Sequence, residues 1–167
     1  GIFRVGDEVK ILPSGFVSKI NSIYNLSKNV KEAFSGSSVS ITLEDDVDIS
    51  RGDMIVKSNN LPIVSQDITA MMCWLSNNKA NPKAKYIIKH TSNEQISIIK
   101  EINYKVNIYT FDTIKDDTNI LMNDIFKAKL RITSPIMQDQ YEINKDTGSF
   151  ILIDATTHET VAAGMIS

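Results

Sequence analysis

An alternation of apolar and polar residues with a period of two runs through much of this chain, and it limits the possible fold more than any other feature. It is clearest in residues 38–43 and 127–133, where aliphatic residues alternate with serine, threonine, lysine or arginine. Successive side chains of a β-strand point to opposite faces, so this pattern places one face on a core and the other in water. We therefore expect an all-β chain, with weak support for a helix only over residues 29–34.

Turn-forming residues separate the predicted strands. Pro13, Ser14 and Gly15 lie between predicted strands at residues 8–12 and 16–24 and predict a hairpin. Residues 146–148 (Asp-Thr-Gly) open a predicted strand over residues 149–154, which turns back into another over residues 160–166. Many short strands joined by such turns are typical of a sandwich or a barrel. Residues 68–75 are apolar on both faces, so this strand is expected to be covered on both sides.

A polar segment over residues 57–66 marks the expected domain boundary. It contains Pro62, which has no backbone N–H to donate to a sheet. We expect two antiparallel β-barrels, one over residues 1–60 and the other over residues 67–167. Within the second barrel, residues 76–85 and 112–123 are expected to form loops.

The charge balance bears on the partners. The chain has 18 basic and 20 acidic residues and a net charge of −2, whereas a nucleic-acid binder usually has a basic excess or a basic stripe. Lys127, Lys129 and Arg131 are the nearest approach to a stripe, and a solvated strand face explains them as well. We expect no nucleic-acid partner. We also expect no membrane association, because no apolar run approaches the ~20 residues of a membrane helix.

The cysteine content and the start of the chain bear on its compartment. Cys73 is the single cysteine, which rules out an internal disulfide and suits a reducing, cytoplasmic environment. The first residues form no signal peptide. They also lack an initiator methionine, so we expect the chain to be a piece of a longer protein.

Residues that could carry chemistry are few. A phosphate-binding loop requires Gly-x-x-x-x-Gly-Lys-Ser/Thr, and the sequence contains no Gly-Lys pair. The Asn-Lys-Asp sequence at residues 144–146 only partly matches a guanine-reading motif and lies in a predicted turn. His90, His158 and Cys73 lack the spacing of a zinc site. We expect no catalytic, cofactor-binding or metal-binding residue in this chain.

Short motifs give both halves a resemblance to translation-type GTPases such as elongation factor Tu. The second half resembles their third domain, and the first half their second domain. The residues that carry the resemblance are Gly148, Phe150, Asp154, Thr160, Val161, Gly164 and Ile166 in the second half, and residues 6–9 and 51–54 in the first.

Longer segments narrow the resemblance to the large subunit of GTP-dependent sulfate adenylyltransferase. These segments are residues 44–54, 72–76, 86–90, 102–106 and 139–154. The resemblance implies a parent enzyme, a nucleotidyltransferase of sulfate assimilation. That enzyme couples GTP hydrolysis to the conversion of ATP and sulfate into adenylyl sulfate and pyrophosphate. Gln140 departs from the proline that is usual in this family, which is a local difference in a turn.

The same resemblance implies what this chain does within that enzyme. The barrels would be non-catalytic, and GTP and Mg²⁺ would bind in an N-terminal GTPase domain that this chain does not contain. The partners would be that GTPase domain and the small catalytic subunit. The opening strand of the first barrel would also be missing, because the chain starts just before the Gly6-Asp7 turn. The alternative is a pair of tRNA-binding barrels from a translation elongation factor.

Residues 139–154 also contain a candidate interface. In the strand over residues 149–154, Phe150 and Leu152 share one face, while Ile151 and Ile153 share the other. A strand that is apolar on both faces needs a cover on each. The candidate interface residues are Asp139, Tyr141, Asn144, Thr147 and Gly148, with Tyr141 as the possible anchor. A loop folded back over its own barrel would explain the same residues, and the sequence leaves both interpretations open.

Overall fold

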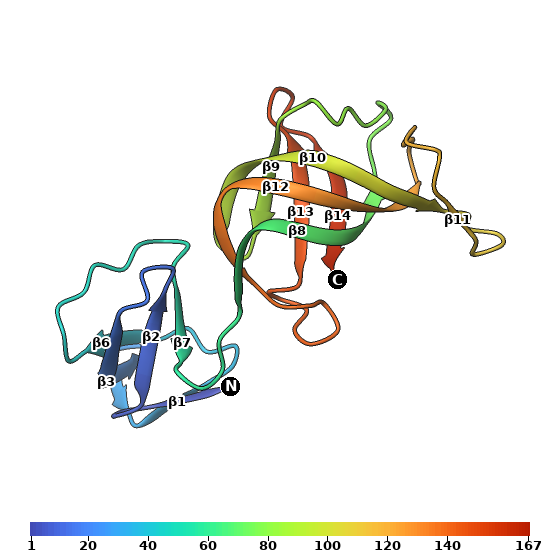
Figure 1. Ribbon diagram of the computed structural model, residues 1–167. Coiled ribbons are helices and arrows are strands. Elements are labelled where there is room, and N and C mark those ends of the chain that lie inside the picture. The colour runs from blue at the N-terminus through green and yellow to red at the C-terminus, as the bar shows by residue number, and fades with distance from the viewer. The chain divides into compact units, whose positions relative to one another are not determined.

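The computed structural model describes residues 1–167 and contains fourteen β-strands and no helix (Figure 1). The predicted all-β fold is therefore confirmed. None of the chain forms a helix that could span a membrane. The chain divides into two compact units, residues Gly1–Leu61 and Pro62–Ser167.

The first unit is built from two small sheets around its own core. One sheet has the strand order β4-β3-β2-β7, with β6 also paired to β3, and the other pairs β1 with β5. The core is a cluster of Val9, Ile20, Ile23 and Ala33. The strands are β1 (Ile2–Arg4), β2 (Glu8–Leu12), β3 (Val17–Asn25), β4 (Lys28–Val30), β5 (Glu32–Phe34), β6 (Ser40–Leu43) and β7 (Met54–Lys57).

Local turn chemistry explains the hairpins of this unit. The predicted hairpin is confirmed: Gly15, with a φ of +80°, lies between β2 and β3 and donates its N–H to the Ile11 carbonyl. The helix expected over residues 29–34 is wrong, because this segment forms β4 and β5. Leu26 and Ser27 both adopt positive φ angles between the paired residues Asn25 and Lys28. A two-residue turn of this kind matches the twist of a hairpin, so it directs the chain into a strand.

β1 and β7 are among the strands of the first unit that leave an edge unpaired. β1 pairs only with β5, and β7 pairs only with β2. A groove of about 450 Å³ is lined by residues of both strands, including Phe3 and Ile55, and by Gly1. Unpaired edges present N–H and C=O groups that a further strand could satisfy.

The second unit is a closed barrel of six strands. The ring runs β10-β12-β8-β14-β13-β9 and closes through a β9–β10 pairing, while β11 extends β10 beyond the ring. The strands are β8 (Ile63–Trp74), β9 (Tyr86–His90), β10 (Asn93–Val106), β11 (Thr113–Ile114), β12 (Ile125–Gln138), β13 (Ser149–Asp154) and β14 (Thr160–Ile166).

Alternate residues of each barrel strand fill the interior, as the period of two predicts. In β8, Ile68, Ala70, Met72 and Trp74 are buried, whereas the residues between them are partly exposed. Within the barrel, the outer face of this strand is apolar and partly exposed, and it forms part of the site described below. Whether another part of the protein covers this face stays a prediction.

The loops of the barrel agree broadly with the sequence. Residues 76–85 form a loop without strands, fixed by the Tyr86 hydroxyl, which donates to the Asn81 carbonyl and accepts from the Asn81 N–H. Residues 112–123 are a loop except for the short strand β11, which extends the long β10 strand into a projecting hairpin (Figure 1).

Candidate interaction surface

The loop over residues 139–148 is closed on itself by hydrogen bonds across its neck. The Thr147 hydroxyl donates to the Asp139 carboxylate at 2.7 Å. The Asp139 N–H in turn lies 3.4 Å from the Thr147 carbonyl. Within the loop, the Asn144 side chain accepts from the Asp146 N–H at 3.2 Å. These bonds give an exposed, polar segment one defined conformation.

The same loop is tied to the last strand of the barrel. The Tyr141 N–H donates to the Ile166 carbonyl at 2.9 Å, and the Ile166 N–H donates to the Gly148 carbonyl at 2.8 Å. Gly148 is needed for this close approach, because a Cβ there would lie 2.6 Å from the Asn144 carbonyl oxygen and closer still to the Tyr141 Cα. The loop is thus part of the barrel's own framework, as one of the two interpretations of the sequence required.

His90, at the end of β9, supports the loop from below. Its Nε2 lies 2.7 Å from the Thr147 carbonyl oxygen, and because a carbonyl can only accept, the Nε2–H group donates this hydrogen bond. The side chain is almost fully buried. Burial lowers the pKa of His90 below its ordinary value of 6.5, against the opposing effects of the Thr147 hydrogen bond and the Asp139 charge.

We expect this histidine to make the fold sensitive to acid. His90 takes up a proton near pH 6.5 in the unfolded chain but only at a lower pH in the folded chain. The free energy of unfolding is therefore unaffected by this group above about pH 6.5, and it decreases as the pH falls below about 6.5. His90→Gln keeps a donor for Thr147 and removes the titration. Urea denaturation between pH 7.5 and pH 5 should show a flatter slope for this variant than for the wild type. Equal slopes for His90→Gln and the wild type would contradict the assignment.

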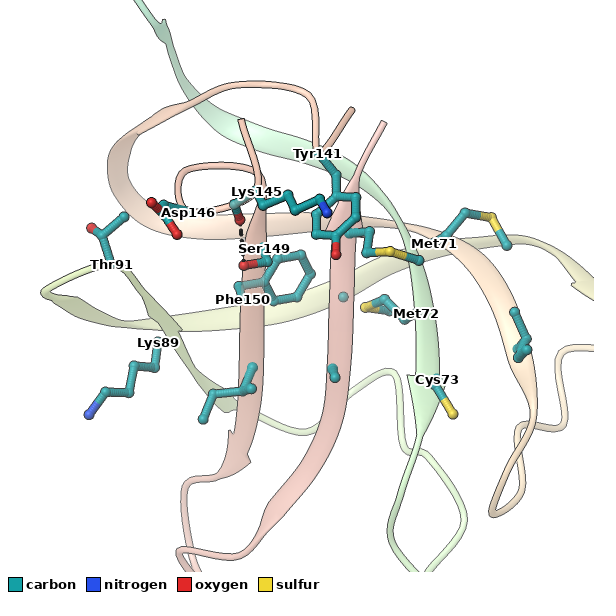
Figure 2. Close-up of a pocket in the computed structure, with 15 residues that line it drawn as sticks. Met71, Met72, Cys73, Lys89, Thr91, Tyr141, Lys145, Asp146, Ser149 and Phe150 are labelled. Carbon is teal, nitrogen blue, oxygen red and sulfur yellow. Dashed lines mark hydrogen bonds between the residues drawn. The ribbon is translucent and has the colours of Figure 1, made fainter. Parts of the chain in front are cut away.

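The outer face of β8, β14 and β13 forms a groove of about 630 Å³ beside this loop (Figure 2). Strand register sets side chains in rows across this face. Cys73 pairs with Ala163, which pairs with Ile151, while Met71 pairs with Met165. Ala163 and Gly164 are the smallest residues that line the groove, and they leave space between the larger side chains around them. The groove is therefore predominantly apolar and open to solvent.

Tyr141 connects the loop to the groove. Its side chain projects from the loop over β14 (Figure 2), where it lines both this groove and a smaller hollow of about 250 Å³ that also contacts Met71 and Met165. Lys145 and Asp146 of the loop lie at the same end of the groove as Tyr141 (Figure 2), and Lys89 on β9 lines the groove away from the loop. An apolar floor with an aromatic wall and a few charges at the rim is the composition of a protein-binding surface.

The structure thus brings the five candidate interface residues together in one loop but gives them different roles. Asp139, Thr147 and Gly148 hold the loop closed, Asn144 lies exposed in its turn, and Tyr141 alone among them lines the groove. The sequence did not identify the methionines of β8 and β14. Apolar residues on both faces of residues 68–75 were the signal that could have indicated them.

The structure holds no cluster of three or more His, Cys, Asp or Glu side chains that could bind a metal ion. The Asn-Lys-Asp sequence at residues 144–146 is part of the closed loop, where the Lys145 carbonyl accepts a hydrogen bond from the Ser149 hydroxyl (Figure 2).

Comparison with protein families gives one match. Residues 67–167, the barrel that carries the groove and the loop, match the model described as the GTP-eEF1A C-terminal domain-like family.

Curated relatives extend the similarity to the whole chain. A sulfate adenylyltransferase subunit 1 from a Sulfurovum species is 42% identical over 175 residues, covering 99% of this chain and 36% of that protein. The bifunctional enzyme CysN/CysC of Mycobacterium tuberculosis is 40% identical over 167 residues, covering 99% of this chain and 27% of that protein. The chain thus spans between about a quarter and a third of the length of these relatives.

Solved structures share the fold at lower sequence identity. Sup35 complexed with GDP superposes with a TM-score of 0.87 at 16% identity, covering 99% of this chain and 41% of that one. The apo form of translation elongation factor SelB from Methanococcus maripaludis superposes with a TM-score of 0.76 at 22% identity, covering 100% of this chain and 37% of that one.

Proposed function

The chain belongs to the GTP-eEF1A C-terminal domain-like family, and from this we propose that it forms the non-catalytic barrels of a sulfate adenylyltransferase large subunit. The observation that carries the proposal is the identity of about 40% over 99% of the chain to proteins with that name. The translation factors that share the fold are only 16–22% identical, which disfavours the alternative of tRNA-binding barrels.

In this proposal the complete protein is a GTP-driven nucleotidyltransferase of the cytoplasm, where ATP and GTP are available. A small catalytic subunit joins ATP and sulfate into adenylyl sulfate and releases pyrophosphate. GTP and Mg²⁺ bind in a GTPase domain that precedes this chain. The barrels transmit the nucleotide state to the small subunit, since a ligand shifts a conformational equilibrium only through different contacts in the two states.

We further propose that the groove beside Tyr141 is a docking surface within this assembly. Its apolar floor, formed around Ala163, is supported by closed-barrel strands and therefore needs little reorganisation before binding. The occupant is either the GTPase domain or the small subunit.

The test uses the full-length large subunit purified with its small subunit. The wild-type complex should form adenylyl sulfate and pyrophosphate from ATP and sulfate in a GTP-dependent manner. Tyr141→Ala should weaken small-subunit binding, or the stimulation by GTP, by about tenfold, the usual effect of truncating an interface aromatic. The melting temperature should change little, because the backbone of Tyr141, rather than its side chain, ties the loop to Ile166.

A matched control is Tyr24→Ala, which removes a similarly accessible tyrosine from β3 of the first unit and should leave both readouts unchanged. If the complex forms no adenylyl sulfate with or without GTP, the enzyme assignment is wrong. If Tyr141→Ala lowers only the melting temperature, the groove is a packing feature and the docking surface lies elsewhere.

A further inference from the structure

The projecting hairpin between β10 and β11 carries three large apolar side chains that the fold leaves in solvent. Tyr109 is 87% exposed, Phe111 is 81% exposed and Ile108 is 49% exposed. Single exposed apolar residues are ordinary, but a group of three within four consecutive residues marks an interaction site. We call residues 107–112 the aromatic tip.

The aromatic tip has a fixed conformation rather than a loose one. The Asn107 side-chain oxygen accepts from the Tyr109 N–H at 2.9 Å and from the Thr110 N–H at 3.3 Å. The Asn107 N–H donates to the Asp112 carbonyl, and the Phe111 N–H donates to the Asn107 carbonyl. These bonds close the turn and fix its backbone, so little backbone entropy remains to be lost on binding.

Phe111 adopts a left-handed backbone conformation, with a φ of +62°. This conformation is unusual and unfavourable for a bulky residue. Asparagine or glycine would occupy the position with less strain. Phe111 is 81% exposed, so neither burial nor core packing of its side chain offsets this backbone strain. Leu26 combines exposure with a positive φ in the same way, so it is the grouping of Phe111 with Tyr109 and Ile108, rather than strain alone, that indicates a contact outside this chain.

The base of the aromatic tip is braced by ion pairs. Lys105, on β10, lies 3.0 Å from the Asp117 carboxylate and 2.8 Å from the Asp124 carboxylate. It also donates to the Asn119 carbonyl. The Lys105 side chain is only 12% exposed, so these contacts are partly shielded from water. The returning segment of the hairpin is thereby fixed to the strand that leads into the tip.

The aromatic tip is continuous with the apolar groove. Val106, the residue before the tip, pairs with Ile125, and Ile125 pairs with Cys73 on β8. Cys73 pairs with Ala163, which belongs to the groove floor. Paired residues of an antiparallel sheet share a face. One apolar row therefore runs from the base of the tip across the outer face of the barrel.

Charge next to the aromatic tip indicates the kind of surface that it meets. Asp112, Lys115 and Asp116 follow the aromatic residues in sequence, and all three are exposed. Carboxylates at this position oppose an approach to anionic lipid headgroups or to the phosphates of RNA. They match instead a protein pocket that is apolar inside and basic at its rim.

We propose that the aromatic tip is the anchor by which this chain binds the small catalytic subunit, inserting Tyr109 and Phe111 into an apolar pocket with a basic rim. The inference rests on the proposed function, which supplies the partner. The inference assigns the main contribution to small-subunit binding to the aromatic tip rather than to the groove. Large aromatic side chains at the centre of an interface usually dominate its affinity.

The experiment measures the affinity of the purified small subunit for the full-length large subunit by isothermal titration calorimetry. The double variant Tyr109→Ser with Phe111→Asn removes both aromatic side chains, and asparagine tolerates the left-handed backbone, so the fold should keep its melting temperature. We expect the affinity to fall by about 100-fold, as for the loss of paired aromatic anchors. Tyr109→Phe preserves the ring and should keep the affinity within about twofold of the wild type.

The matched control is Leu26→Ser, which changes a 92% exposed leucine with a positive φ at the tip of the β3–β4 hairpin, and which should bind like the wild type. Unchanged affinity in the double variant, together with tight binding by the wild type, would overturn the anchor and leave the proposed function standing. A wild-type subunit that fails to bind the small subunit at all would instead remove the proposed function. Self-association, RNA binding or binding to phosphatidylserine vesicles that disappears only in the double variant would also overturn the proposal.

Discussion

Replacing Trp74 with alanine is expected to lower the free energy of unfolding of the barrel by about 3–5 kcal/mol, the usual cost of truncating a buried tryptophan. Its side chain is 1% exposed, and its ring meets the ring of Tyr86 edge to face at 5.9 Å between centroids. The indole N–H donates to the Asn78 carbonyl at 2.7 Å. The substitution would therefore leave a cavity and also release an anchor of the loop over residues 76–85.

A loss of this size is a large part of the 5–15 kcal/mol that stabilises an ordinary domain. Urea denaturation followed by circular dichroism measures it, because Trp74 is the only tryptophan and its fluorescence disappears with it. Trp74→Phe keeps most of the apolar volume but leaves the Asn78 carbonyl without this donor, so its cost should be smaller, about 1–3 kcal/mol. A loss below about 1 kcal/mol for Trp74→Ala would show that the residue is not a core residue.

Replacing Gly148 with alanine should destabilise the barrel by about 3 kcal/mol, although only a methyl group is added. The new Cβ would lie 2.6 Å from the Asn144 carbonyl oxygen and in a still closer clash with the Tyr141 Cα. Both contacts are with backbone, so no side-chain rotation can relieve them. The loop must shift, and the bonds that tie it to Ile166 and His90 must lengthen.

Gly164 provides the matched comparison. A Cβ there would clash with the ring of Phe150, with 2.7 Å to one ring carbon, rather than with backbone. Gly164→Ala should therefore be partly rescued when Phe150 is also changed to leucine. Gly148→Ala should gain nothing from the Phe150→Leu change. The melting temperatures of the two glycine variants, each with and without Phe150→Leu, measure this rescue. A Gly148→Ala protein as stable as the wild type would show that the loop is not held against the barrel.

Apolar patterns and turn residues predicted four of the six ring strands, β8, β12, β13 and β14, because a half-buried strand leaves its period directly in the sequence. Segments of three residues leave no period. The segment that forms β4 and β5 was therefore predicted to be a helix. The turn at Leu26 and Ser27, which starts this segment, contains neither glycine nor asparagine, the residues that usually mark such a turn in a sequence. How the strands close into a ring depends on pairings between distant segments, which a local pattern does not contain.

The candidate site was predictable only in part for the same reason. The loop over residues 139–148 could be found because its residues are contiguous. The groove could not, because Met71 and Met165 become neighbours only through the pairing of β8 with β14. The aromatic tip lies in a turn, where no periodicity distinguishes an exposed aromatic residue from a buried one.

The position of β14 in the ring has a consequence for biosynthesis. This strand lies between β8 and β13, so the last strand of the chain supplies the pairings that close the ring. A ribosome therefore has to synthesise the barrel beyond Ile166, and that residue has to leave the exit tunnel, before the ring can close around its core. Until then the apolar residues of β8 stay exposed. Because the strands that pair are distant in sequence, closure of the ring is slow. The exposed apolar residues and unpaired strand edges of the unclosed barrel favour aggregation in this interval.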